Sequence, residues 1–173
     1  MDPLMLVLRL FHIVGGVLWV GGAFLFVAFI GPAAAATAPA SGSLLSHAVK
    51  QRHVATFLTT VAVTTVIAGW LMWARFAMQG DSVMGWVGST YGLVLTIGGV
   101  LATVAAYFGI TGVGNNVVRL VDVGDEVAAS GGPPSAEQAA RLAHLSAEIR
   151  KHGMIDIVLL VLAVAAMATA AYW

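Results

Sequence analysis

Residues 4–30 read LMLVLRLFHIVGGVLWVGGAFLFVAFI, an apolar run in which only Arg9 and His12 carry ionisable side chains. A helix needs roughly 20 apolar residues to cross the ~30 Å hydrocarbon core of a bilayer, so this run predicts a transmembrane helix. At about 100° per residue, His12, Gly16 and Trp19 fall on one face of it. An ionisable side chain within a membrane span marks a functional site by default. His12 is therefore the first candidate.

The composition of the chain places it among integral membrane proteins. Hydrophobic residues make up 60% of the 173 residues and charged residues 9%, and the mean hydropathy is +0.93. Such a chain has too little polar surface to coat a soluble globule. Four apolar runs of membrane length predict four helices: 4–30, 54–78, 90–114 and 154–173. We expect an all-α fold, a four-helix membrane bundle forming one domain over residues 1–173.

Lysine and arginine gather in two of the three connections between these spans. Six of the eight lie there: Lys50, Arg52, Arg119, Arg141, Arg150 and Lys151. Because cytoplasmic loops are enriched in lysine and arginine, both termini are expected outside and these connections in the cytoplasm. The predicted location is the cell membrane, as a multi-pass protein of a bacterial inner membrane. The formal net charge of zero argues against nucleic acid as a partner.

The connection before the fourth span carries two opposite signals. Residues 124–134, GDEVAASGGPP, are predicted to form a flexible linker. Ser135, with Gln138 three residues on, has the form of a capping box, so a helix should begin there. We expect this helix to be a cytoplasmic extension that runs without interruption into the fourth span.

The candidate ligands fall at two depths. His12 lies roughly 12 Å inside the outer end of the first span, whereas His53 and His152 lie at the inner ends of the second and fourth. These levels are ~20 Å apart, too far for one metal ion to join them. The chain has no cysteine, so a metal would need nitrogen, oxygen or thioether ligands. We therefore expect two candidate sites.

At the inner level, His152 and Asp156 are four residues apart, so the carboxylate is expected to receive a ring N–H. His53 is expected to approach from the neighbouring helix. Two histidines and a carboxylate can bind a transition metal or relay protons. The alternative is an interfacial cluster in which the histidines meet lipid headgroups and Asp156 pairs with a nearby cation.

At the outer level, His12 has no second histidine within one chain. Met72 and Met167 lie toward the outer ends of their helices and are candidate thioether ligands; a second chain of a homo-oligomer is another source. Arg9 and Arg75 are placed to meet an anionic group such as a haem propionate. The alternative for His12 is a hydrogen bond to a neighbouring helix.

The first span also carries a longer pattern: His12-x-x-x-Gly16-x-x-Trp19-x-Gly21-Gly22. This pattern resembles the first helix of the copper resistance protein D-like superfamily, which includes HemJ-type protoporphyrinogen oxidases and the membrane domain of some urate oxidases. Arg52 and His53 at the start of the second span, and Gly69 towards its end, extend the resemblance. It implies a four-helix membrane protein that binds b-type haem through His12, while other members are associated with copper.

The favoured hypothesis is a membrane haem b-binding redox protein with His12 as axial ligand. It would exchange electrons with quinone or another redox protein, or act as a haem-dependent oxidoreductase on a small hydrophobic substrate. Haem would lie between helices, with its face admitted by Gly16, its edge near Trp19 and its propionates towards Arg9 or Arg75.

Two other functions stay open. One is a transporter or channel for a metal ion or proton that uses His53, His152 and Asp156 as an inner gate or relay. The other is a structural or assembly subunit, for which faces of small residues are helix interfaces and the histidines are incidental.

Overall fold

The structure, a computed structural model, describes residues 2–80 and 82–172. Over these residues the fold is helical, without strands. Four helical stretches are long and apolar enough to cross a membrane: Pro3–Ala36, Val54–Ala77, Thr90–Ser130 and Ala136–Tyr172. The predicted all-α fold with four membrane-length helices is confirmed. The predicted end of the last span, residue 173, lies outside the described residues.

Each long stretch is assembled from shorter segments. The first joins α1 (Pro3–Leu25), a π-helical stretch (Phe26–Ile30) and α2 (Gly31–Ala36). The second follows α3 (Gly42–Ser46) and a π-helical stretch (His47–Gln51), and consists of α4 (Val54–Ala77). The third follows the short α5 (Val83–Gly88) and joins α6 (Thr90–Tyr107), a π-helical stretch (Phe108–Gly114) and α7 (Asn115–Ser130). The fourth joins α8 (Ala136–Thr169) and a 3₁₀ turn (Ala170–Tyr172).

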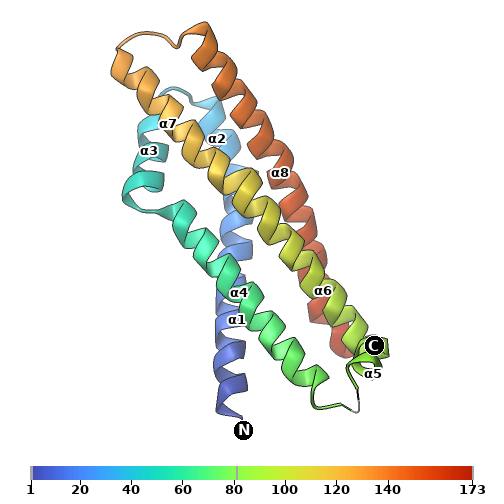
Figure 1. Ribbon diagram of the computed structural model, residues 1–173. Helices are drawn as coiled ribbons and strands as arrows, with labels where there is room; N and C mark the ends of the chain where they lie inside the picture. The colour runs from blue at the N-terminus through green and yellow to red at the C-terminus, as the bar shows by residue number, and fades with distance from the viewer. Residues whose placement is uncertain (1, 81, 173) are drawn as a thin grey trace.

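The long helices alternate in direction, so both ends of the chain lie at the same end of the bundle (Figure 1). We call this the termini end and the opposite one the far end. α1 packs along α4. Both α6 and α7 pack along α8, and α4 also contacts α6. The buried centre consists mostly of small side chains around one tryptophan: Trp19, Ala23, Ala62, Ala105, Ala106 and Leu160. Small residues let helix backbones approach closely, as membrane bundles require.

The first half of the predicted linker, residues 124–134, is helical. α7 continues through Gly124 to Ser130 and ends at Gly131, whose φ of 68° is the left-handed conformation common after a helix. Val117 and Val121 on α7 are buried in a cluster that Ile149 of α8 packs against. This tertiary packing outweighs the weak helix propensity of glycine.

α8 begins where the sequence predicts. The Ser135 hydroxyl accepts from the Gln138 N–H at 3.2 Å, and the Gln138 side chain accepts from the Ser135 N–H at 3.0 Å. The capping box is therefore confirmed. α8 then runs unbroken past Gly153. A Cβ at Gly153 would lie 2.9 Å from Val27, so a side chain of the first stretch packs against the α8 backbone there.

Candidate functional site

His12 on α1 forms a hydrogen bond to α4. Its Nδ1 lies 2.9 Å from the backbone carbonyl oxygen of Thr65. Because a carbonyl oxygen only accepts, Nδ1 is the donor, and Nε2 of the neutral ring keeps its lone pair. The hydrogen bond to a neighbouring helix, the alternative for this residue, is thus present. It is also the arrangement that fixes the tautomer of metal-binding histidines, because it leaves Nε2 free for a ligand.

Glycines make room for this contact between α1 and α4. A Cβ at Gly69 would lie 2.8 Å from Cε1 of His12 and 3.0 Å from Nδ1, closer than carbon atoms tolerate. A Cβ at Gly15 would lie 2.5 Å from the Thr65 hydroxyl oxygen. The imidazole therefore lies directly against the α4 backbone, and only glycine at position 69 permits this.

His12 lines a cavity of about 280 Å³ at the termini end, to which all four long helices contribute. Its wall includes four aromatic side chains, two thioethers and one guanidinium: Trp70, Trp73, Phe76, Tyr91, Met72, Met167 and Arg9. The two methionines that the sequence offers as thioether ligands are thus brought to the same cavity as His12. Proteins bind small ligands in such cavities, with mostly apolar walls and a few polar groups.

Two tryptophans on α4 hold the wall of this cavity against α6. Trp70 donates from Nε1 to the Thr103 hydroxyl at 2.9 Å, and Trp73 donates to the Thr96 hydroxyl at 2.8 Å. The two indoles also pack edge to face, with ring centroids 5.6 Å apart. Because each tryptophan is fixed by a hydrogen bond and an aromatic contact, this part of the wall is preformed.

The other haem-contacting residues predicted around His12 do not all meet it. Of the two arginines, Arg9 lines the cavity, but Arg75 instead binds Asp2 at 2.7 Å. Gly16 lies against the Thr65 methyl group, 3.7 Å from where its Cβ would be. Trp19, only 4% exposed, lines a second cavity nearer the middle of the bundle. The face shared by His12 and Trp19 is thus divided between two cavities, because it extends over two helical turns.

The second cavity has a volume of about 60 Å³ and contains Asp156 on its wall. Asp156 is 2% exposed, and its Oδ1 has no hydrogen-bond partner among the described residues. The expected ring N–H from His152 is therefore not donated to this oxygen. The prediction that Asp156 pairs with a cation is also unmet, since none of the ion pairs between described residues includes it.

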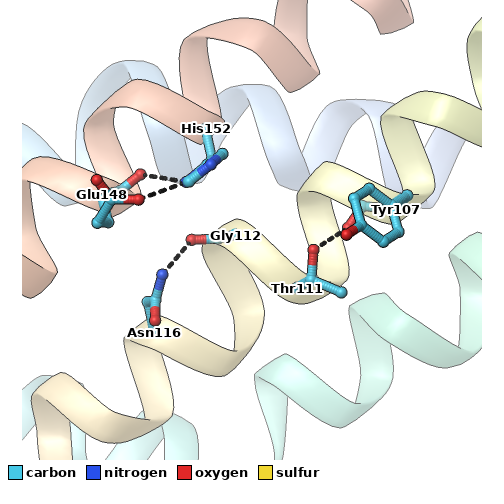
Figure 2. A network of polar contacts seen from close by, with 6 residues as sticks. All are labelled: Tyr107, Thr111, Gly112, Asn116, Glu148 and His152. Carbon is cyan, nitrogen blue, oxygen red and sulfur yellow. Dashed lines mark hydrogen bonds and ion pairs between the residues drawn. The ribbon is translucent and has the colours of Figure 1, made fainter.

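His152 makes a different contact from the one predicted. Its Nδ1 donates to the backbone oxygen of Glu148 at 3.0 Å and lies 3.4 Å from the Glu148 carboxylate, as Figure 2 shows. Its ring stacks on Phe108, and the backbone of Gly112 lies directly beneath it. The ring is thus directed towards the preceding turn of α8, so the predicted pairing of His152 with Asp156 is wrong.

The π-helical stretch Phe108–Gly114 supplies the surface on which His152 and Asp156 lie. Within and after it, Thr111 donates to the oxygen of Tyr107, and Asn116 donates to the oxygen of Gly112 at 2.9 Å (Figure 2). A π-helical stretch shifts the backbone hydrogen-bond register, and such side chains satisfy the carbonyls that the shift exposes.

His53 does not join an inner metal site. It is an exposed residue immediately before α4, with a left-handed backbone (φ 52°). Within residues 2–80 and 82–172, no three His, Cys, Asp or Glu side chains are grouped closely enough to hold a metal ion. The predicted site of His53, His152 and Asp156 is therefore not assembled, because the three side chains point to different surroundings.

No protein-family model, curated protein or solved structure matches this chain. The resemblance to the copper resistance protein D-like superfamily thus rests on the residues of the first two spans alone. Functional assignment depends on the chemistry of the two cavities.

Sequence reasoning identified His12, Arg9 and the two methionines but missed most of the aromatic wall. Trp70 and Trp73, three residues apart, lie on one face of α4 together with Gly69, and Thr96 and Thr103 repeat at helical spacing on α6. One helix face with indoles and another with hydroxyls at matching spacing is the signal that would have predicted the tryptophans of this wall.

Proposed function

We propose that the protein is a membrane haem b-binding redox protein in which Nε2 of His12 is an axial ligand of the iron. The observation that carries this proposal is the Nδ1–H hydrogen bond of His12 to the Thr65 carbonyl oxygen at the wall of a 280 Å³ cavity. That bond orients the ring and makes Nε2 the basic nitrogen, as for other metal-bound histidines.

The other residues of the cavity suit this group chemically. Met72 or Met167 would supply a thioether to the iron beside the His12 imidazole, a ligand pair known from cytochromes. Arg9 would bind a propionate. The volume lies near the lower bound of small-molecule sites, roughly 300–1,000 Å³. A group of haem's size therefore requires outward movement of the wall or a ring edge that faces lipid.

When bound, haem supplies one-electron chemistry at its iron. The chain's own residues fix the tautomer of His12, line the cavity with aromatic side chains and place the Arg9 guanidinium at its wall. Iron held by both His12 and a methionine would suit electron transfer with a quinone or another redox protein. Iron held by His12 without a methionine would suit oxidation of a small hydrophobic substrate.

The same proposal includes the orientation and location of the bundle. Six of eight lysines and arginines belong to segments of the far end, in the α3 region, α7 and the first half of α8. By the positive-inside rule, the far end is cytoplasmic and both termini are outside. The membrane would be the bacterial inner membrane.

A copper site is the second candidate, because one cavity contains an imidazole and two thioethers. His12, Met72 and Met167 all line it. Thioether and imidazole ligands select soft copper(I) over harder ions. In this case the protein would bind one copper ion per cavity without haem.

Absorption spectroscopy and metal analysis of protein purified from haem-replete cells separate these candidates. We expect a Soret band in the wild type, its loss in His12→Ala and its retention in His144→Ala, the matched change at an exposed histidine. Stoichiometric copper without a Soret band would favour the copper site and contradict the haem site. Neither haem nor copper, or a Soret band unchanged in His12→Ala, would overturn the assignment of His12.

A further inference from the structure

Asp156 is buried, 2% exposed, beside a cavity whose wall is mostly apolar. The cavity beside it is lined by the first helical stretch, α4, the third stretch and α8. Apart from the indole of Trp19, only Asp156 and Thr59 bring polar side chains to its wall. A carboxyl group in this position is costly unless it is paired, hydrogen-bonded or neutral.

Neither pairing nor complete hydrogen bonding is found around Asp156 in the described residues. Its Oδ1 has no partner. The residues lining the cavity from α1, α4 and the Phe108–Gly114 stretch include no lysine, arginine or histidine. On the same face of α8, one and two turns towards the far end, the titratable groups are His152 and Glu148, which bind each other; Arg150 and Lys151 between them are exposed.

The backbone of the π-helical stretch approaches the carboxyl group closely. A Cβ at Gly109 would lie 3.2 Å from Oδ2 of Asp156 and 3.4 Å from Oδ1. The glycine thus leaves space for the carboxyl group at a point where any other residue would press on it. This is a specific accommodation of a polar group, and π-helical turns are frequent at functional sites.

The chemistry of the wall restricts what can bind there. Magnesium and calcium need about six or more oxygen ligands, and a zinc site needs at least three protein ligands. One carboxyl group and one hydroxyl do not meet either requirement. The volume of about 60 Å³ is instead well above the roughly 10–15 Å³ that a cavity needs to hold a water molecule.

We propose that Asp156, together with water in this cavity, is a proton-binding site in the interior of the bundle. The carboxyl group holds the proton, and its free Oδ1 and the Thr59 hydroxyl hold the water through which the proton exchanges. The site is separate from the cavity at His12 and does not depend on a cofactor there.

Infrared spectroscopy of the purified protein in lipid nanodiscs at neutral pH tests the proposal. We expect a carboxylic acid C=O band that shifts to lower frequency in deuterated water. The band should be lost in Asp156→Asn and kept in Glu137→Gln, a matched change at an exposed carboxylate. Wild-type protein with ¹³C-labelled aspartate should shift the same band, which keeps the test valid if Asp156→Asn does not fold.

Two outcomes would overturn the proposal. A wild-type spectrum without an aspartic acid band would mean that Asp156 is ionised and held by a cation. A band without isotope shift would mean that no water reaches it. Ala62→Val adds methyl groups at the cavity wall, where Ala62 is 2% exposed, and should slow the isotope shift. An unchanged rate in this variant would exclude the cavity as the water site.

Discussion

At the scale of single residues, the position of the His12 ring depends on the absence of a side chain at Gly69. The imidazole reaches the Thr65 carbonyl oxygen because Gly69 has no side chain between the ring and the α4 backbone. The spacing of His12 and Gly16 indicated a functional face on α1 but not this acceptor, which lies 53 residues away in sequence. A half-buried hydrogen bond of this kind contributes roughly 0.5–1.5 kcal/mol to stability.

Gly69→Ala adds only one methyl group, but it should displace the His12 ring and destabilise the fold. The new methyl group must displace the ring, and overpacking of this kind typically costs about 1–3 kcal/mol. We expect a lower midpoint of thermal unfolding in detergent, followed by circular dichroism. Gly21→Ala is the control, since nothing lies within 4 Å of its Cβ position. Equal midpoints for the two variants would show that the ring does not lie against Gly69.

At the scale of elements, polar contacts at the far end join α7 to the segment made of α3 and the π-helical stretch after it, residues 42–51. Nζ of Lys50 lies 2.8 Å from both Asp122 and Asp125, and the Ser46 hydroxyl donates to Asp125 at 3.0 Å. The hydrogen bond to Asp122 first, and then that to Asp125, raises the pKa of Lys50 to about 12. The sequence showed these charges but not which of them pair.

The raised pKa predicts how stability varies with pH. The pKa of Lys50 is higher in the folded state than its ordinary value of 10.5. The contribution of Lys50 to the free energy of unfolding is therefore complete below pH 10.5 and is lost as pH rises through about 12. Lys50→Met should therefore be less stable than wild type at pH 8, with a difference that shrinks above pH 10.5. Chemical denaturation in detergent at several pH values measures this.

Lys151→Met provides the matched control, because Lys151 is exposed and none of the ion pairs between described residues includes it. Its difference from wild type should not vary over the same pH range. A Lys50→Met difference that persists undiminished at pH 12 would contradict the role of the two carboxylates.

At the scale of the whole molecule, the cavity at His12 and the cavity at Asp156 follow one another along the bundle. On α4, Ala62 lines the smaller and Thr65 the larger, three residues apart, which corresponds to ~4.5 Å along the helix axis. Buried Ala105 and Leu160 belong to the packed core at this level. The proposed ligand site and the proposed proton site are thus neighbours with different walls.

The orientation of the bundle is also a property of the whole molecule. Since the chain has no cysteine, a single one can report the side of the membrane. Gln79 follows α4, which ends at the termini end, and Gly132 lies between α7 and α8, which meet at the far end (Figure 1); both residues are exposed. A membrane-impermeant maleimide should label Gln79→Cys in intact cells, and Gly132→Cys only after the membrane is opened. The reverse pattern would contradict the proposed orientation.

The sequence by itself determined the four membrane-length helices, the capping box that begins α8 and the face that carries His12. Each of these follows from residues close together in the chain, whose spacing alone sets helix length, helix start and helix face. Tertiary structure decided that Met72 and Met167 share a cavity with His12. It also decided that Trp19 lines another cavity, and that His152 binds Glu148 instead of Asp156. Those outcomes depend on how each helix is rotated and packed against the others, which local spacing does not specify.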